Sequence, residues 1–543
     1  MVKLNWKTAI IFLTGVLMYF GNAFAELKAF PTAEGYGRLA KGGRGGSVIE
    51  VTNLNRSGPG SFGAAIAAKG PRTVVFRVSG YIQGGFTVKN PYLTIAGQTA
   101  PGKGICIKHG TFAVSSQHVV VRFIRSRLGS GKGGDGFSSP GCENVIWDHC
   151  SVSWTNDEAF SAHPTGNITV QRTLIAEALN PRHHGFAASV LGNIGSYHHN
   201  LLANNFGRNV SMAGKNNGGK CWGKMDIRNN VVYNWGIRTT DGEINLVNFV
   251  NNYFKPGPAS TLYVGMRCTF TTFCGGEQKY YLSGNVMPGH FGPDEVEKSY
   301  NLDGHNNRTV PKSEFLSSEP FYPSYVETQT AEEAYVDVMS NVGCNVPMLD
   351  DTDKRIIKGV LDSTTSYVGS KTGFPGIPDH ENDVGGYEEY QEVKRPDNWD
   401  TDHDGMPDEW EKKKGLNPSD KTDGNNTNLS DEGYTNLEMY LNELAGDFKV
   451  KTALQPQPDA NSFAKWGADY SYNSIKRTLH IQSTSTRRLK VDILSLKGEI
   501  VLSRELTPRN GEITLSLEGL RAGLYLLRFH ANNRVQIGKI NRL

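Results

Sequence analysis

Five acidic residues in the C-terminal half of the chain have the spacing of a metal-binding loop. The segment Asp400-Thr401-Asp402-His403-Asp404-Gly405 is followed by a glutamate at the twelfth position. EF-hand-type loops place oxygen ligands at alternate positions, a glycine at the sixth and a bidentate acid at the twelfth. The alternative is a solvated acidic turn, which would not need this spacing. We therefore predict a calcium site formed by the Met406 carbonyl and the side chains of Asp400, Asp402, Asp404, Asp408 and Glu411.

Two pairs of carboxylates could serve a hydrolase. Asp157 adjoins Glu158, and Asp241 lies two residues before Glu243. A glycoside hydrolase uses one carboxyl group as general acid and a second as base or nucleophile. Neither pair lies within a glycosidase motif, so hydrolysis stays an alternative function.

The composition limits the class of protein. The 543 residues include 57 Lys and Arg and 54 Asp and Glu, a net charge of +3 that gives no basic surface for nucleic acid. The 62 glycines exceed the roughly 38 expected at ~7% usage, without the period of collagen. This excess indicates many tight turns and closely stacked backbone, and the length indicates more than one domain.

The N-terminus has the features of an export signal. Lys3 and Lys7 precede an apolar run at residues 9–20, which is too short to span a bilayer, and Ala23-Phe24-Ala25 offers a cleavage site. We therefore predict that residues 1–25 are a signal peptide and that the protein is secreted or at the cell surface. No later segment is long and apolar enough to span a membrane.

Export permits disulfides, but seven cysteines leave at least one thiol free. Cys268 and Cys274 are close enough in sequence for a local bridge. Cys142 and Cys150 could also pair, although Cys150 fits a buried position in a repeat.

Short β-rich segments repeat from about residue 74 to 287. Their fourth positions are separated by 22 to 33 residues and are Ile124, Cys150, Thr173, Asn200, Asn230, Asn252 and Asn285. An irregular period of this length is typical of a solenoid with variable loops, whereas a propeller blade needs ~40–45 residues. An asparagine at a turn can hydrogen-bond to the equivalent asparagine one coil away. We therefore predict an all-β chain built on a parallel β-helix.

Strand alternation bears on two clusters in this repeat. Arg125 and Arg127 share one face of a strand and could bind an acidic substrate or pair with acids on adjacent coils. Asp148 and His149 are consecutive, so we expect them to point to opposite faces, to form no catalytic dyad and to have a structural role.

A set of motifs occurs in one order along the first half of the chain. It comprises residues 29–37, 42–46, 71–76, 93–99 and 144–151, and His198-His199-Asn200 followed by Arg208. The set resembles the secreted bacterial pectate lyases of polysaccharide lyase family 1, whose fold is a right-handed parallel β-helix. The resemblance implies cleavage of polygalacturonate by calcium-assisted β-elimination: a base removes the C5 proton beside the uronate carboxylate, and the bond at C4 breaks.

The resemblance also assigns the acidic residues. Asp135 and Asp157 match calcium ligands, and their alternative role is to cap turns in glycine-rich loops. Ser161 stands where the family has another acid. This departure implies a weaker site, with calcium held mainly by substrate, or a shifted ligand such as Glu158.

The basic residues of the site follow from the same resemblance. Arg208 matches the catalytic base, although a guanidinium with a pKa above ~12 needs a nearby positive charge, calcium or an alkaline medium to act as one. The second basic residue that commonly follows it is missing from residues 209–212. The family's substrate-binding lysine falls in the segment Arg182-His183-His184, where His184 is the first candidate and His183 and Arg182 are the alternatives.

The predicted organisation has five parts. Residues 1–25 are the signal peptide, 26–395 the lyase domain, 396–445 an EF-hand-like helical calcium module, 446–465 a proline-containing linker and 466–543 a β-sandwich. Segments 511–515 and 520–525 resemble the sorting domain of the type IX secretion system, and an accessory carbohydrate-binding sandwich is the alternative. The expected partners are an acidic plant cell-wall polysaccharide and the secretion machinery. The competing functions are a β-helix pectin hydrolase and a non-catalytic glycan binder.

Overall fold

The structure is a computed structural model that describes most of the chain in two units. Residues 26–448 are described except 132, 216–217, 271–274 and 305–309, and residues 468–542 except 474–476, 484–488, 495–499, 509–511, 521–522 and 532–533. The chain divides into the compact units Met1–Phe448 and Lys449–Leu543. The predicted signal peptide and most of the predicted linker lie outside the described residues.

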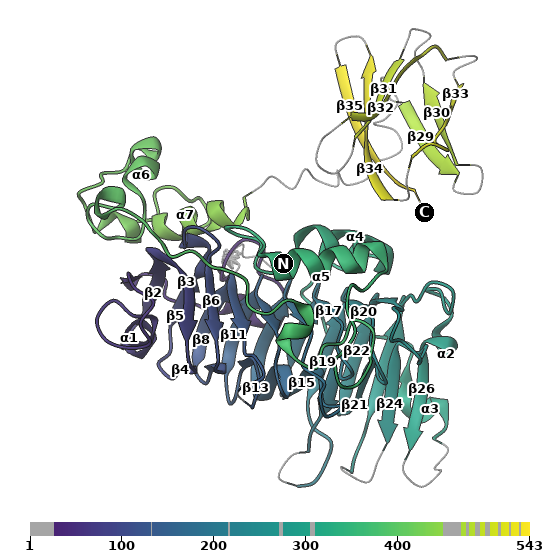
Figure 1. The fold of residues 1–543 in the computed structure, drawn as a ribbon, viewed down its shortest axis with the longest axis horizontal. Coiled ribbons are helices and arrows are strands. Elements are labelled where there is room, and N and C mark those ends of the chain that lie inside the picture. The colour runs from purple at the N-terminus through teal and green to yellow at the C-terminus, as the bar shows by residue number, and fades with distance from the viewer. Residues whose placement is uncertain are drawn as a thin grey trace, which may run out of the picture. The chain divides into compact units, whose positions relative to one another are not determined.

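The first unit is a parallel β-helix whose coils place short strands on three faces (Figure 1). The first face holds β1 (Ser47–Val51), β2 (Arg72–Phe76), β5 (Leu93–Ala96), β8 (Gln117–Arg122), β11 (Glu143–Asp148), the end of β13 (Glu158–Gln171), β16 (Gly195–His198), β19 (Lys224–Arg228), β22 (Leu246–Val250), β25 (Lys279–Ser283) and β27 (Leu316–Ser317). The second holds β3 (Val78–Gln83), β6 (Ile105–Lys108), β9 (Ile124–Arg127), β12 (Ser151–Ser153), β14 (Leu174–Ala176), β17 (Leu201–Ala203), β20 (Val231–Tyr233) and β23 (Tyr253–Lys255). The third holds β4 (Phe86–Val88), β7 (Phe112–Val114), β10 (Phe137–Ser138), the start of β13, β15 (Phe186–Gly192), β18 (Ser211–Ala213), β21 (Thr240–Glu243), β24 (Met266–Phe270) and β26 (Tyr300–Gly304).

The corner between the first and second faces confirms the predicted asparagine ladder. The side chains of Asn200, Asn230, Asn252 and Asn285 each hydrogen-bond to the next one along the stack at 3.0 Å. The residue before each of these positions has left-handed backbone, with φ of 53° at His199. The turn therefore repeats in every coil, and the asparagine satisfies the backbone groups that it exposes.

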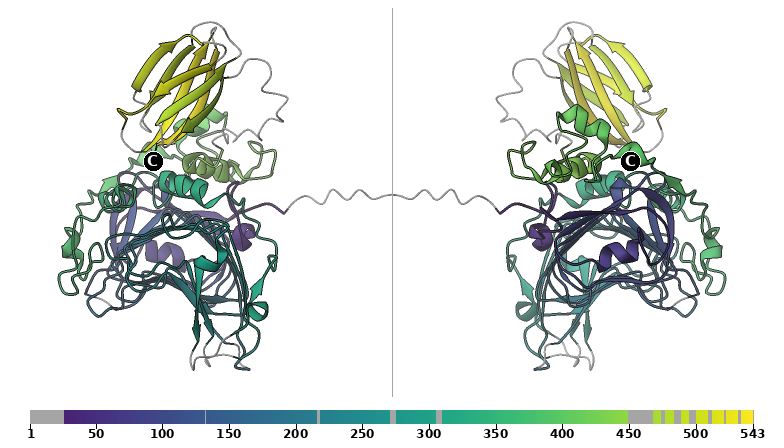
Figure 2. Two further views of the ribbon diagram at one scale, coloured as in Figure 1. Left: turned by 90° about the vertical axis from the view of Figure 1, so that its right-hand side faces the viewer. Right: turned by 90° about the vertical axis from the view of Figure 1, so that its left-hand side faces the viewer.

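The apolar core runs along the inside of the coils and is closed at one end by a helix. Apolar strand residues such as Val121, Trp147 and Val170 are fully buried in it. Helix α1 (Phe62–Ala67) contributes Phe62 and Ile66 to the same core, and Figure 2 shows this helix across the end of the coils.

Helices α4 (Ala331–Asn341), α5 (Asp351–Asp362), α6 (Asp408–Lys414) and α7 (Asn436–Ala445) follow the coils and cover parts of their outside (Figure 1). The short helices α2 (Val296–Ser299) and α3 (Lys312–Phe315) lie between the last strands, and the 3-10 turns are η1 (Tyr36–Leu39), η2 (Gly97–Thr99), η3 (Glu381–Val384), η4 (Asp397–Trp399) and η5 (Asp423–Asn425). Helices α4 and α5 bury Val338 and Ile356 against Leu174 and Leu201 of the second face. Strand β28 (Val393–Lys394) pairs antiparallel with β3.

Arg125 and Arg127 bind acids of α5 and of the residue before it, not acids of adjacent coils. Both arginines are buried, and Arg127 Nη2 lies 2.7 Å from Asp353 and 3.2 Å from Asp350. Arg125 Nε lies 3.3 Å from Asp350. These contacts explain the arginines as a buried link between β9 and α5.

Asp148 and His149 contact each other, so the expectation that they point apart was wrong. His149 follows the last residue of β11 and has a φ of 49°, which ends strand alternation and turns its ring back. Its Nδ1 lies 2.8 Å from Asp148, which also binds Arg122 at 2.7 Å. All three side chains are buried, in keeping with the structural role that we expected.

The described cysteines form neither of the two bridges that the sequence allowed. Cys142, Cys150 and Cys268 carry free, buried thiols. Cys268 lies in β24 with its side chain in the apolar core. Cys221 is disulfide-bonded, and Cys274 lies outside the described residues.

The second unit consists of two small antiparallel sheets. One contains β29 (Ala468–Asn473), β30 (Thr478–Ser483) and β33 (Glu512–Ser516), and the other β31 (Leu489–Leu494), β32 (Ile500–Leu506), β34 (Gly523–Ala531) and β35 (Arg534–Arg542). Leu479, Ile481, Val491 and Leu527 are buried in a shared core.

Candidate active site

The acids assigned to the active site lie at equivalent or adjacent positions of successive coils. Phe137 of β10 pairs with Phe160 of β13, so Asp135 and Glu158, each two residues earlier, also correspond. Asp157 immediately precedes Glu158. Because neighbouring parallel strands are ~4.8 Å apart, the register brings the three acids together. Their carboxylates each offer an oxygen within 4.8 Å of the others.

Ser161 hydrogen-bonds to this group without adding a charge to it. Its Oγ donates to Asp135 Oδ2 at 2.5 Å, and Glu158 stands as the third carboxylate. Burial raises the pKa of Asp135, the Ser161 hydrogen bond opposes this, and the charge of Asp157 adds to it. Three hard oxygen donors with mutual repulsion fit a calcium ion.

Arg208 lies between β17 and β18 and forms an ion pair with Glu158. Its φ is 55°, a left-handed conformation that costs a non-glycine residue of order 1–2 kcal/mol. The guanidinium carbon lies 4.2 Å from the centre of the Phe186 ring. Burial first, and the charge of Arg238 second, lower the pKa of Arg208, which is the direction that a general base requires.

Arg238 supplies a second cation that we did not predict from the sequence. Ser211 of β18 pairs with Asp241 of β21, so Arg208 and Arg238, each three residues earlier, correspond. The Arg238 guanidinium carbon lies 5.0 Å from the centre of the Phe186 ring and its Nη1 lies 3.1 Å from Asp241. Aligned positions of successive coils therefore carry first Asp135 and Glu158, then Phe186, and then Arg208 and Arg238.

Of the three candidates for substrate binding, the structure brings His184 to the acidic group. Its Nε2 lies 2.9 Å from Asp157 Oδ1, and both side chains are about half exposed. The His183 ring instead packs against Phe206 with the ring centres 5.4 Å apart. Arg182 is exposed.

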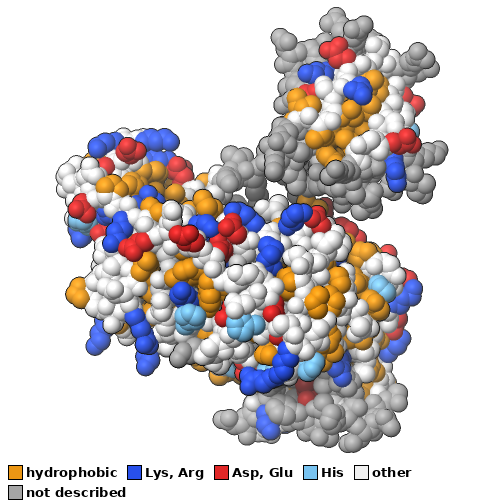
Figure 3. All heavy atoms as spheres, in the orientation of Figure 1, with side chains coloured by type: hydrophobic (Ala, Val, Ile, Leu, Met, Phe, Trp, Pro, Cys, Tyr) orange, Lys and Arg blue, Asp and Glu red, His pale blue; other side chains and the backbone are white. Residues whose placement is uncertain are grey.

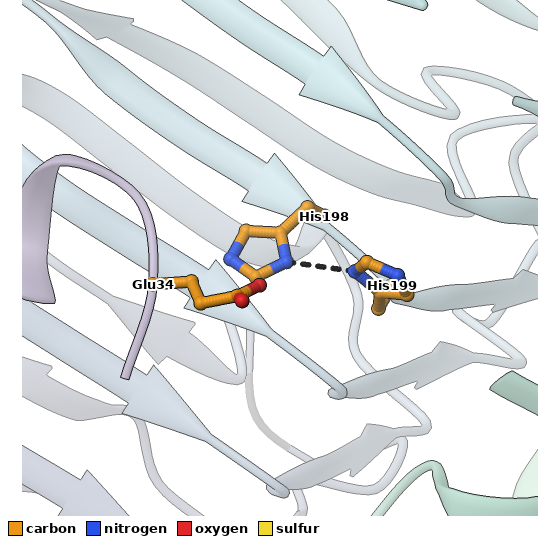
Figure 4. Close-up of side chains that lie close together, drawn as sticks. All are labelled: Glu34, His198 and His199. Carbon is orange, nitrogen blue, oxygen red and sulfur yellow. Dashed lines mark hydrogen bonds between the residues drawn. The ribbon is translucent and has the colours of Figure 1, made fainter. Parts of the chain in front are cut away.

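Glu34, His198 and His199 form a separate group in which both histidines are buried and Glu34 is half-buried (Figure 4). The Nδ1 atoms of the two histidines are 2.9 Å apart, and His199 Nε2 lies 3.0 Å from Gln329 Oε1. Because the amide oxygen accepts, His199 Nε2 donates and His199 Nδ1 accepts from His198. Burial first, and the charge of Arg172 second, lower the pKa of His199 to about 4. We interpret this group as structural.

The acidic loop of residues 400–411 lies outside the row of active-site positions. Its carboxylates form one group from Asp400, Asp402 and Asp404, and a second from Asp404, Glu411 and Asp423. Asp408 belongs to neither group, because its side chain accepts hydrogen bonds from Thr401 N and Oγ1, both at 2.8 Å.

Acidic, basic and histidine side chains alternate over the face shown in Figure 3, with no large area of one charge. This agrees with the near-neutral composition. Within the described ranges, no helix has the length and apolar character needed to cross a membrane.

Comparison with known proteins gives two results. Residues 473–541 match the family described as "Secretion system C-terminal sorting domain". The chain is 34% identical over 451 residues to "Probable pectate lyase C" of Aspergillus fumigatus, covering 79% of this chain and 96% of that protein. The corresponding figures for "Probable pectate lyase C" of Emericella nidulans are 34%, 78% and 95%.

A solved structure titled "Pectate lyase bound to hexasaccharide" is 13% identical, with a TM-score of 0.40, and covers 60% of this chain and 99% of that one. The identity and coverage of the fungal relatives, together with the β-helix, assign the protein to a family. The chain belongs to the pectate lyases.

Proposed function

We propose that the protein is a secreted pectate lyase that cleaves polygalacturonate by calcium-assisted β-elimination to unsaturated oligogalacturonides. The observation that carries this proposal is the row of acids, Phe186 and two arginines along successive coils. A polyuronate offers a carboxylate on each sugar, which suits alternating contacts to a cation held by acids and to guanidinium groups.

Asp135, Asp157 and Glu158 are the residues that would hold calcium. When bound, the ion supplies Lewis-acid stabilisation of the substrate carboxylate beside C5. Glu158 supplies the third negative charge of the group, which Ser161 cannot supply. The donor set contains only carboxylates, in agreement with the oxygen preference of calcium.

Arg208 is the proposed base, and it removes the proton from C5. The electron pair of the C5–H bond forms the C4–C5 double bond as the C4–O bond breaks. The oxygen leaves with the neighbouring sugar and takes up a proton from water to become a hydroxyl group. Arg208 must first leave its ion pair with Glu158, because that carboxylate stabilises the charged guanidinium. The charge of Arg238 disfavours the charged form of Arg208. Arg238 is also the cation that binds the uronate carboxylate, once its own ion pair with Asp241 opens. His184 holds Asp157 or the substrate acid, and we rank His183 and Arg182 behind it.

The test is absorbance of unsaturated uronate with polygalacturonate and calcium. We expect Arg208→Ala to lose on the order of 10²–10⁴ of kcat, with an unchanged circular dichroism spectrum. Exposed Arg56, far along the coils, provides the control Arg56→Ala, which should retain full activity.

Two outcomes would contradict the proposal. New reducing ends without a double bond would indicate hydrolysis by a carboxylate pair such as Asp157 and Glu158. Binding of pectic polymers, methylated or not, with no products at all would indicate a glycan-binding protein.

We further propose that residues 1–25 direct export and that the second unit is read by the type IX secretion machinery. The match at residues 473–541 supports the sorting role of the second unit. The domain boundaries at 395, 445 and 465 remain part of this proposal. Deleting residues 473–541 should leave lyase activity inside the cells and remove it from the medium and cell surface. Equal activity outside the cells would contradict a sorting role.

A further inference from the structure

The acidic loop and the start of η5 contain buried carboxylate oxygens that no protein group satisfies. Among the described residues, Asp404 Oδ2, both carboxylate oxygens of Glu411 and Asp423 Oδ1 have no hydrogen-bond partner. The three residues are 2%, 0% and 7% exposed. A buried carboxylate without a partner costs several kcal/mol. A cation is the partner that would remove this cost.

The unpartnered oxygens converge because two loops approach closely at Asp404. The two carboxylate groups share this residue, and within each group the oxygens lie within 4.8 Å of one another. Gly424 makes the approach possible, since a Cβ there would stand 2.6 Å from Asp404 Oδ2. Gly405, with a φ of 93°, turns the loop at its sixth position.

The fifth acidic ligand differs from the one expected from the loop motif. Asp408 caps Thr401 and forms a long contact of 3.7 Å with Lys412. Asp423 instead enters from η5, twelve residues beyond the end of the loop. Its second oxygen accepts a hydrogen bond from Asn417 N at 3.1 Å, which leaves Oδ1 directed to the group.

We propose that Asp400, Asp402, Asp404, Glu411 and Asp423 bind one calcium ion that fastens residues 396–448 to the first coils of the β-helix. Five carboxylates and the Met406 carbonyl provide the six to eight hard oxygens that calcium takes.

The loop is also part of the contact with the coils. Met406 is buried with Ala96, which ends β5, and with Leu437 of α7. His403 Nδ1 lies 2.9 Å from Glu50 of β1. Ordering the loop around an ion therefore orders the surface that packs on these strands.

Calcium binding to the full-length chain tests the proposal in a background of Asp135→Asn, Asp157→Asn and Glu158→Gln, which removes the charge of the three active-site acids. Isothermal titration should give one site. We expect Asp423→Asn to weaken it at least tenfold and Asp408→Asn less than threefold. Exposed Asp431 provides the matched control Asp431→Asn, which should not change the affinity.

Measurements of stability and of proteolysis test the same site without relying on lyase activity, and they show whether each variant is folded. In chelator, Asp423→Asn should be at least as stable as its parent because it removes a buried negative charge. On addition of calcium, the free energy of unfolding of Asp423→Asn should increase less than that of its parent. Chelator should expose residues 396–448 to trypsin in the parent, and calcium should protect them. Absence of a saturable site, equal affinity in Asp423→Asn and Asp431→Asn, or protection that does not depend on calcium would overturn the proposal.

Discussion

Removing Arg127 separates its structural role from the substrate-binding alternative that the sequence left open. Arg127 contacts Asp350 and Asp353, and all three side chains are at most 2% exposed. In Arg127→Met the methylenes remain, but two buried carboxylates are left with Arg125 as their cation. Breaking a buried pair in this way costs about 3–5 kcal/mol, which is a factor of roughly 10²–10⁴ in the folding equilibrium.

The assay is guanidinium unfolding followed by tryptophan fluorescence, together with lyase kinetics at a temperature where the variant is folded. We expect a lower unfolding midpoint and an unchanged KM. Adding Asp353→Asn should recover part of the loss, because it removes one unpaired charge. The control is Lys358→Met on α5, the helix that carries Asp353. The Lys358 side chain is 76% exposed and pairs with Asp362. It should cost less than about 1 kcal/mol. A loss below 1 kcal/mol in Arg127→Met, or a tenfold rise in KM at full stability, would refute the reasoning.

Three further predictions concern the ladder, the buried histidines and the second arginine. Asn230→Ala removes hydrogen bonds to Asn200 and Asn252 at 3.0 Å, so urea unfolding should show a loss of about 2–4 kcal/mol from unsatisfied groups; a loss below 1 kcal/mol would contradict this. His199 has a folded pKa of about 4, below its ordinary 6.5, so the unfolded chain takes up the proton first. Up to about 3 kcal/mol of stability should vanish as pH falls from 6.5 to 4. His199→Asn should lower the slope of the free energy of unfolding against pH by the equivalent of about one proton. An unchanged slope would exclude His199 as its source. Arg238→Gln should move the alkaline rise in kcat to higher pH, because the pKa of Arg208 increases, and an unshifted profile would contradict that coupling.

The features that the sequence predicted well are those set by the period of the coils. Asp135 and Asp157 were assigned through the family resemblance. The asparagine ladder, in contrast, recurs with the coil length, so the proximity of its members follows from spacing. The same signal was present for Arg238. It follows Arg208 by 30 residues, which is also the distance from Asn200 to Asn230.

The features that the sequence missed depend on contacts outside the repeat. The partners of Arg127 lie 223 and 226 residues away, and no periodicity indicates that distance. Asp423 lies beyond the loop motif that it completes. His149 turned back because a left-handed residue interrupts the alternation of its strand, which residue types alone do not reveal.

The ion pairs of Arg122 determine where a pull on the C-terminal part of the chain would be borne. Asp447, next to the last residue of the first unit, is held by Arg122 at 2.8 and 3.1 Å. Arg122 belongs to β8 and is held in turn by Asp148 of β11. Tension arriving from beyond residue 448 therefore enters the strands directly at these pairs. Helix α7 and the acidic loop lie upstream of this anchor, so the ion pairs relieve them of part of the load for as long as the pairs hold.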